Sequence, residues 1–337
     1  MVTNLMCSKH QPSLHFVYNL RSREHLKSME TSGKTYGAPV VLFVYNRLLH
    51  LQKTIDALQT NNEAASSLLY IFSDASKNIE DQNAVSEVRQ YLRKISGFST
   101  VHIIERKENY GLARSIIKGV TEVCQEHGRV IVIEDDMVVS PYFLKFMNDA
   151  LALYEHDEGV ISISGYQYPV KADWPETFFL KGADCWGWAT WKRGWDLFEP
   201  DGRALLREIT EQKLTYRFDF NGSYPYTKML KDQIKGRNNS WAIRWYASAF
   251  LKDKLTLYPG HSLVLNIGND NTGTHCSTTN AFTGDISNRP IKVALIPVEE
   301  NLLARQLISK YFQTVHPWVM IRIIRKLTNK LQRMWHL

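Results

Sequence analysis

The sequence of 337 residues has only four cysteines, at positions 7, 124, 185 and 276. They are too widely spaced for a zinc site built from paired cysteines, and nothing resembles a disulfide framework, so a reducing compartment is expected. The N-terminus lacks the charged and then apolar pattern of a signal peptide. No apolar run is long enough to span a membrane. These absences together predict a cytoplasmic protein.

The net charge of +7 comes without basic arms or an aromatic-spaced RNA motif, so no nucleic-acid partner is expected. Much of the excess lies in residues 317–337, which contain no acid. The five basic residues there are Arg322, Arg325, Lys326, Lys330 and Arg333. They share one face of a predicted amphipathic helix whose other face is apolar. Such a helix either packs on the rest of the protein or lies on an anionic membrane surface, the inner face of the plasma membrane.

Strand-like and helix-like segments alternate from residue 39 onward. Strands are expected at 39–47, 68–76, 100–107, 129–136 and 160–166, with helices at 48–60, 80–95 and 112–128. This alternation predicts an α/β fold with a doubly wound, mostly parallel sheet flanked by helices. We divide the chain into an N-terminal extension (1–37), an α/β half (38–166), a helical and irregular region rich in aromatic residues (167–290) and a C-terminal helical region (291–337).

The segment RVIVIEDD, residues 129–136, ends a β-branched apolar run in three carboxylates. Such a run is typical of a strand buried on both faces, and ligands of open α/β sheets bind at the carboxyl ends of strands. Ser140 and Pro141 predict the start of the next helix. Adjacent carboxylates repel one another unless they share a positive charge, typically a divalent cation. The alternative is that the acids cap this helix and face solvent.

The order of these segments, with SDAS, NYGLARS and IEDD at their ends, resembles the GT-A glycosyltransferases of the family 2 type. The acidic motif is similar to that of the N-acetylglucosaminyltransferase I family. The resemblance covers residues 38–200 and is weaker to about 276. It implies an inverting, Mn²⁺- or Mg²⁺-dependent transfer of a hexosyl or N-acetylhexosaminyl group from a nucleoside diphosphate sugar, with UDP expected. The acceptor would be a hydroxyl of a carbohydrate, and lipid-linked if residues 317–337 bind a membrane, as in bacterial surface-polysaccharide assembly.

The resemblance also implies roles for residues near the acids. Asp136 would bind the metal, Asp135 would face the ribose, and Glu134 would face the transferred sugar. Asn46 and Arg47 occupy the loop where the family holds the base and phosphates.

Three further residues belong to the implied donor site. Asp74 matches the acid that contacts the uracil or ribose, and Arg114 lies where family 2 enzymes approach the donor. His275 lies where many GT-A enzymes place a histidine near the metal or diphosphate. The alternatives are a solvated arginine and a surface histidine.

Four tryptophans fall within residues 186–195, and core filling explains Trp195. Gly187, flanked by Trp186 and Trp188, is different, because a small residue between flat rings suits the floor of a sugar pocket.

The catalytic base is not assigned by the resemblance, because the family's acid pair between tryptophans is replaced by WAIRW at 241–245. Asp232 is the nearest upstream carboxylate that could take a proton from an acceptor hydroxyl, and Asp219 and Asp253 compete with it.

Two other functions fit the same sheet. A sugar-nucleotide nucleotidyltransferase would need a glycine-rich phosphate loop after the first strand, and FVYNRLLHLQ contains no glycine. A non-catalytic carbohydrate-binding protein would not need the intact acids of IEDD.

Overall fold

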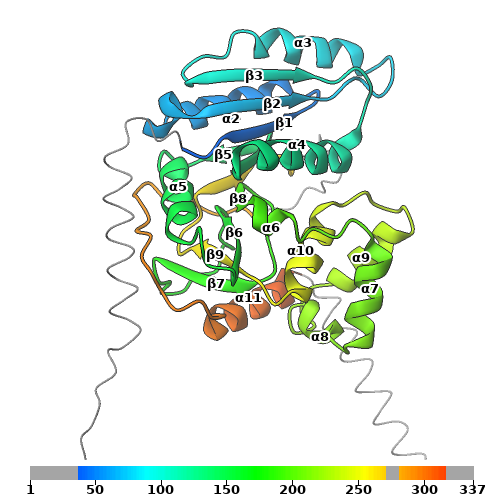
Figure 1. The fold of residues 1–337 in the computed structure, drawn as a ribbon, viewed down its shortest axis with the longest axis vertical. Helices are drawn as coiled ribbons and strands as arrows, with labels where there is room; N and C mark the ends of the chain where they lie inside the picture. Colours follow the sequence, from blue (N-terminus) through cyan, green and yellow to red (C-terminus); the bar gives the residue numbers. More distant parts are fainter. Residues whose placement is uncertain (1–36, 271–280, 316–337) are drawn as a thin grey trace, which may run out of the picture. The chain divides into compact units, whose positions relative to one another are not determined.

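A computed structural model describes residues 37–270 and 281–315. An eight-stranded sheet runs in the order β3-β2-β1-β4-β8-β6-β9-β7 (Figure 1). Its strands are β1 (Val40–Val44), β2 (Leu68–Ser73), β3 (Thr100–Glu105), β4 (Arg129–Glu134), β6 (Val160–Ser164), β7 (Thr177–Lys181), β8 (Trp188–Trp191) and β9 (Leu255–Pro259). The predicted α/β class, with a mostly parallel sheet flanked by helices, is confirmed.

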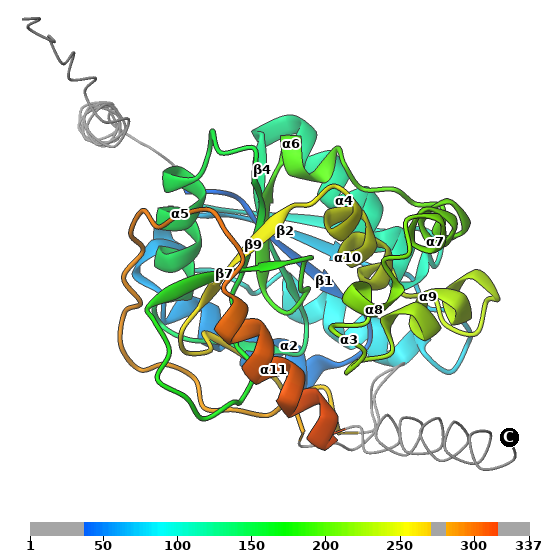
Figure 2. The same cartoon turned by 90° about the horizontal axis from the view of Figure 1, so that it is seen from below.

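The first four strands of the chain are parallel and alternate with α2 (Leu48–Gln59), α3 (Gln82–Leu92) and α4 (Gly111–His127), as the sequence predicts. Side chains of β1 alternate between the two faces of the sheet. Val40 and Leu42 pack with α2, α3 and α5 (Phe143–Leu153), whereas Val41 and Phe43 pack with α4. Figure 2 shows α5 on one side of the strands and α4 on the other. Both faces are therefore covered, which is why β4 is apolar throughout its middle.

The sheet continues beyond the regular alternation. β8 pairs antiparallel with β4 and β6, and β9 joins β6 to β7. The aromatic-rich region thus supplies three strands to the central sheet. Its helices include α6 (Lys192–Trp195), α7 (Gly202–Glu211), α8 (Thr215–Phe218), α9 (Tyr226–Ile234) and α10 (Ala242–Leu251). The longest of these helices, α7, α9 and α10, have nine or ten residues each.

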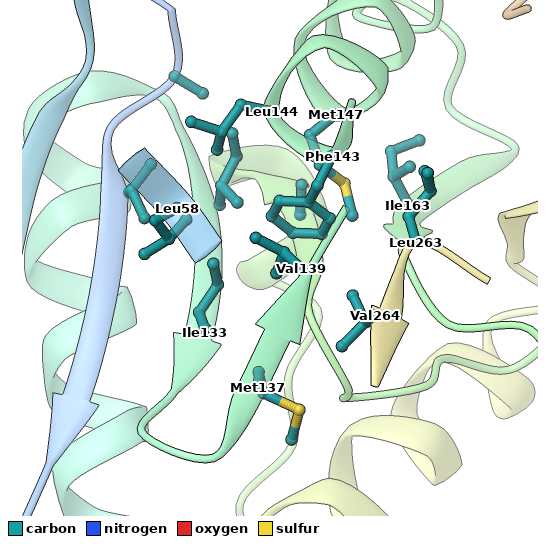
Figure 3. Packing of buried hydrophobic residues seen from close by; sticks show 14 of the residues in the cluster. Leu58, Ile133, Met137, Val139, Phe143, Leu144, Met147, Ile163, Leu263 and Val264 are labelled. Carbon is teal, nitrogen blue, oxygen red and sulfur yellow. The ribbon is translucent and has the colours of Figure 1, made fainter. Parts of the chain in front are cut away.

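The chain after β4 differs from the prediction. A short strand, β5 (Met137–Val139), pairs antiparallel with β10 (Val264–Asn266), and α5 begins only at Phe143. Ser140 is held by neighbouring segments, because its N–H donates to the Leu263 carbonyl oxygen at 2.8 Å and its Oγ to that of Ser287 at 2.8 Å. A turn therefore separates Ser140 from the helix. Figure 3 shows the apolar side chains that pack between β5, β10 and α5.

The last described helix, α11 (Leu302–Val315), buries Ala304, Ile308 and Phe312 in a cluster with Tyr168 and Phe220. Within residues 37–270 and 281–315, no helix is both long and apolar enough to cross a bilayer. His275, residues 1–36 of the predicted extension and the basic segment 317–337 lie outside the described residues.

Candidate active site

The three acids lie where β4 ends, in the middle of the sheet. Glu134 is the last residue of β4, and Asp135 and Asp136 form the turn into β5. The turn is held from two sides: Thr54 Oγ1 donates to the Asp135 carbonyl oxygen at 2.9 Å, and the Ile267 N–H donates to that of Asp136 at 2.9 Å. The side chains of the two aspartates are 7% and 9% exposed. The acids therefore belong to a fixed, nearly buried turn and not to a solvated helix cap.

Arg47 supplies the positive charge that this cluster needs. It follows β1, the parallel neighbour of β4, so the two strand ends meet at one edge. Its Nη2 donates to Asp135 Oδ1 at 2.5 Å and to Asp136 Oδ2 at 2.7 Å. Burial lowers the pKa of Arg47, but the two carboxylates outweigh this and raise it overall. One guanidinium thus bridges two carboxylates.

The cluster remains short of positive charge. Burial, followed by repulsion from Asp136 and Asp135, raises the pKa of Glu134. Burial also raises the pKa of Asp135, although Arg47 opposes the change. Asp136 Oδ1 is buried and has no hydrogen-bond partner among residues 37–270 and 281–315. A buried unpartnered carboxylate oxygen beside raised carboxyl pKa values is what an added cation would relieve.

A divalent metal fits this site only if another molecule supplies some of its ligands. Magnesium-like ions are commonly held by one or two carboxylates together with substrate phosphates. Asp136 Oδ1 can supply one such ligand while Oδ2 stays on Arg47. In the described part of the chain, no group of three or more histidines, cysteines or acids is arranged to hold a metal by itself. The remaining ligands would therefore have to come from a bound phosphate group or water.

The loop after β1 is ordered by one acid. Asn46 Nδ2 donates to Asp81 Oδ1 at 2.9 Å, and the Tyr45 hydroxyl donates to Asp81 Oδ2 at 2.8 Å. The Lys77 N–H donates in turn to the Tyr45 hydroxyl oxygen at 2.9 Å. Asn46 and Arg47 are adjacent in sequence, but only Arg47 reaches the acid cluster.

Asp74 lies at the end of β2, and its carboxylate is already engaged. Its Oδ1 accepts from the Tyr110 N–H at 2.8 Å and its Oδ2 from the Gly111 N–H at 2.8 Å, at the start of α4. This is a favourable place for a negative charge. Through these hydrogen bonds, Asp74 links the end of β2 to the start of α4. A nucleotide could contact Asp74 only through oxygens that already accept these bonds. Arg114 is half-exposed, with its guanidinium 3.8 Å from the Tyr110 ring centroid and 3.3 Å from Glu108 Oε1.

The three residues of the expected sugar pocket separate in the structure. Trp186 lines a cavity, whereas Trp188 is 1% exposed and packs with Trp241 and Trp245 in the core. Gly187 has φ of +56°, and a Cβ there would collide with Val264. Trp186 and Gly187 lie in a bend before β8, whereas Trp188 is the first residue of that strand. Of the three residues, Trp186 is the one that lines the cavity.

The cavity has a volume of about 200 Å³ and walls of aromatic rings. The rings include Tyr166, Tyr168, Trp186, Tyr224, Tyr226 and Phe312. Asp184 also lines it, and its Oδ2 accepts hydrogen bonds from the hydroxyls of Tyr168 at 2.7 Å and Tyr258 at 3.0 Å. The sequence prediction did not include Asp184. Its only sequence signal is a single acid within the aromatic stretch GADCWGW.

The cavity adjoins the acid cluster. β8 runs antiparallel to β4, with Val132 opposite Trp188, so the residues before β8 approach the end of β4 that carries Glu134. The Cys185 thiol also lies close to both the acid cluster and Asp184. Its pKa is raised first by burial and then by the charges of Glu134, Asp184 and Asp136. The two groups of residues therefore form the halves of one candidate site.

The carboxylates expected to act as base have other partners. Asp232 is paired with Lys228 and, at 3.3 Å, with Arg237, and its hydrogen bond from Lys228 is the main cause of its lowered pKa. A lowered pKa makes a carboxylate a weaker proton acceptor. Asp219 Oδ1 accepts from the Thr227 N–H at 2.6 Å at the start of α9. Neither Asp232 nor Asp219 is among the residues that line the cavity.

The exposed acid at the end of α10 is also engaged. Asp253 has a side chain that is 77% exposed and pairs with Lys181. Such an exposed carboxylate does not lie in an enclosed site where it could bind an acceptor.

Comparison with known proteins gives one family match. A family model described as the GNT-I family matches residues 15–201, more than half of the chain. No curated protein matches.

Several solved structures are distantly similar. A mannosyltransferase from Pyrobaculum calidifontis, in complex with GDP-Man and Mn²⁺, is 15% identical over 47% of this chain and 44% of its own, with a TM-score of 0.27. A glucosyl-3-phosphoglycerate synthase from Mycobacterium tuberculosis, in complex with Mn²⁺, UDP and glucosyl-3-phosphoglycerate, is 12% identical over 57% and 64%, with a TM-score of 0.31. A UDP-glucose pyrophosphorylase complexed with UDP-glucose is 12% identical over 67% and 91%, with a TM-score of 0.33. The chain thus spans less than two thirds of the first two proteins. Similarity at this level supports no conclusion about activity.

Proposed function

Because the chain belongs to the GNT-I family, whose model matches residues 15–201, we propose that it is a metal-dependent glycosyltransferase. Its donor would be a nucleoside diphosphate sugar, with UDP as the expected nucleotide, and its acceptor a carbohydrate hydroxyl. The transferred group would be a hexosyl or N-acetylhexosaminyl group, and the transfer would invert the anomeric centre. The observation that carries the proposal is the buried acid turn, in which Arg47 binds one oxygen of Asp136 and no described residue binds the other.

The residues of this turn can bind and orient a donor in distinct ways. Asp136 Oδ1 would hold the metal, which when bound stabilises negative charge that develops on the leaving diphosphate. Arg47 fixes Asp136 through Oδ2 and adds positive charge near the phosphates. Asp135 would face the ribose and Glu134 the transferred sugar. Asn46 and Arg114 would approach the nucleotide from the loops after β1 and at the start of α4.

The test is titration calorimetry of the full chain with UDP, in the presence and absence of Mn²⁺. Asp136→Ala should abolish metal-dependent UDP binding and leave the fold intact, because it removes charge from a turn that repels itself. Asp149→Ala is the matched control, since Asp149 is an exposed acid that pairs with Lys145 on α5. Unchanged Mn²⁺-dependent binding by Asp136→Ala would remove the metal assignment. Absence of UDP binding by the wild-type protein would contradict the proposed function.

We also propose that residues 317–337 hold the enzyme on an anionic membrane surface, where a lipid-linked carbohydrate acceptor would be available. Each lysine or arginine near such a surface contributes about 1 kcal/mol, and Trp318 and Trp335 suit the headgroup boundary. The test is co-sedimentation with anionic liposomes, at low and high salt, of the full chain and of a version ending at Val315. Equal recovery of both proteins would contradict the membrane proposal.

A further inference from the structure

Asp184 is a buried carboxylate that the donor site does not use. It lies in the loop between β7 and β8, and of the described residues that line the aromatic cavity it is the one acid. Burial raises the pKa of Asp184, and the hydroxyls of Tyr168 and Tyr258 oppose the change. No lysine or arginine of the described ranges is among the groups that act on it. A carboxylate is costly to bury without a counter-charge, so its presence indicates a function.

The hydrogen bonds of Asp184 leave one oxygen available. Both tyrosine hydroxyls donate to Oδ2, and Oδ1 accepts from no group in the part of the chain that the structure describes. The tyrosines fix the orientation of the carboxylate without neutralising its charge. Burial raises the pKa of Tyr166 and Tyr226, and the charge of Asp184 is the second-largest cause of the increase. The cavity therefore surrounds one oriented proton acceptor.

The surrounding rings suit a carbohydrate. Trp186 contacts Tyr166 edge to face, with centroids 4.7 Å apart, and its indole lines the cavity beside Asp184. Aromatic rings pack against apolar faces of a ligand, while a carboxylate accepts from its hydroxyls. The end of β4 that carries Glu134 lies next to this cavity through the antiparallel register of β8. A hydroxyl bound at Asp184 would thus lie near the place proposed for the donor.

We propose that the cavity binds the acceptor sugar and that Asp184 is the general base of the transfer. This inference rests on the proposed function. The carboxylate takes the proton of the acceptor hydroxyl as the acceptor oxygen forms a bond to the anomeric carbon. The bond from that carbon to the diphosphate oxygen breaks, and its electron pair leaves with the nucleoside diphosphate. The anomeric centre is inverted, and the proton remains on Asp184 until water removes it.

The experiment measures UDP release by the full chain with Mn²⁺, a panel of UDP sugars and a panel of p-nitrophenyl glycosides as acceptors. The pair that raises UDP release most is used for kcat and KM. Asp184→Asn keeps the size of the side chain and an oxygen for the tyrosine hydroxyls, but it cannot take the proton. Its kcat should fall by a factor on the order of 10² to 10⁴. Its Kd for UDP with Mn²⁺ should stay within about twofold of the wild-type value, since donor binding is separate.

The matched comparison is Asp232→Asn, at the carboxylate predicted from sequence, with Asp149→Asn as the surface control. A large loss of kcat in Asp232→Asn with normal turnover in Asp184→Asn would overturn the inference. A raised KM at unchanged kcat in Asp184→Asn would also overturn it, since that result describes binding alone. Failure of the wild-type protein to bind UDP with Mn²⁺ would instead remove the proposed function, and the inference with it.

Tyr258→Phe tests the role of Asp184 as the base even if Asp184→Asn does not fold. The Tyr258 hydroxyl lowers the pKa of Asp184, so its removal should raise that pKa. A base must be deprotonated to act, and the acid limb of the kcat profile should therefore move to higher pH. The charged or titratable neighbours Tyr168, Tyr226 and Cys185 remain in place. An acid limb at the wild-type position would contradict the role of Asp184.

Discussion

Replacing Arg47 with methionine removes the guanidinium that bridges Asp135 and Asp136 and keeps a similar apolar length. The Arg47 side chain is 17% exposed, and the carboxylates are 7% and 9% exposed. Removing one partner of a buried ion pair typically destabilises a protein by about 3–5 kcal/mol, because the remaining charge is left uncompensated. Two carboxylates lose their partner here, but the raised pKa of Asp135 allows that carboxyl to take up a proton. We therefore expect a loss of about 3 kcal/mol at pH 8, the low end of that range.

The assay is urea unfolding in the presence of a chelator, with Arg93→Met as the control. Arg93 is 59% exposed and pairs with Glu105 at 2.7 Å, so its loss should cost about 0–1 kcal/mol. For a slope of about 3 kcal/mol per molar urea, the Arg47→Met midpoint should fall by about 1 M. The difference should shrink at pH 5, where a protonated Asp135 needs no counter-charge, and Mn²⁺ in place of the chelator should restore part of it at pH 8. A midpoint within about 0.3 M of the wild-type value at pH 8, by the same conversion, would refute this account of the acid turn.

Three further results are expected. Gly268→Ala should weaken Mn²⁺-dependent UDP binding in calorimetry, because a Cβ at this position would collide with the Asp136 carboxylate; normal affinity would show that the turn can shift freely. The wild-type protein with chelator should lose stability as the pH rises from 5 to 8, because Glu134, with its pKa raised to about 8, makes the folded state bind more protons than the unfolded state in this range; stability that rises with pH would contradict the charge imbalance. Trp188→Ala should lower the free energy of unfolding by about 3–5 kcal/mol, because Trp188 is buried in the core. Trp186→Ala should mainly raise the KM for the acceptor, because Trp186 lines the cavity. The opposite pattern in thermal unfolding and kinetics would contradict this assignment of the two tryptophans.

The first half of the fold, residues 38–166, could be predicted from sequence because its signals are local. The run Val130–Ile133 is apolar and β-branched, and it forms the buried middle of β4. The acids and Arg47 each lie at or just after the end of a strand, and parallel neighbouring strands end at one edge, so their proximity follows from the alternation alone. Only the exact partner of each oxygen required the structure.

The second half could not be predicted because its pairing is not local. β8 is four residues long and joins the sheet between β4 and β6, a place that no periodicity in its own sequence indicates. Without that pairing, Trp186 and Trp188 look equivalent, although one lines the cavity and the other fills the core. Asp184 was missed for the same reason, since its partners Tyr168 and Tyr258 are separated from it by 16 and 74 positions.

The direction of β8 explains how the proposed donor and acceptor sites can meet in this fold. β1 and β4 are parallel and deliver Arg47 and the acids at their carboxyl ends. A further parallel strand would bring only its own carboxyl end to that edge. Because β8 is antiparallel to β4, it presents its amino end there, and with it the preceding loop that contains Asp184. The change from parallel to antiparallel pairing thus brings a loop from the second half of the chain to the edge where open α/β sheets bind their ligands.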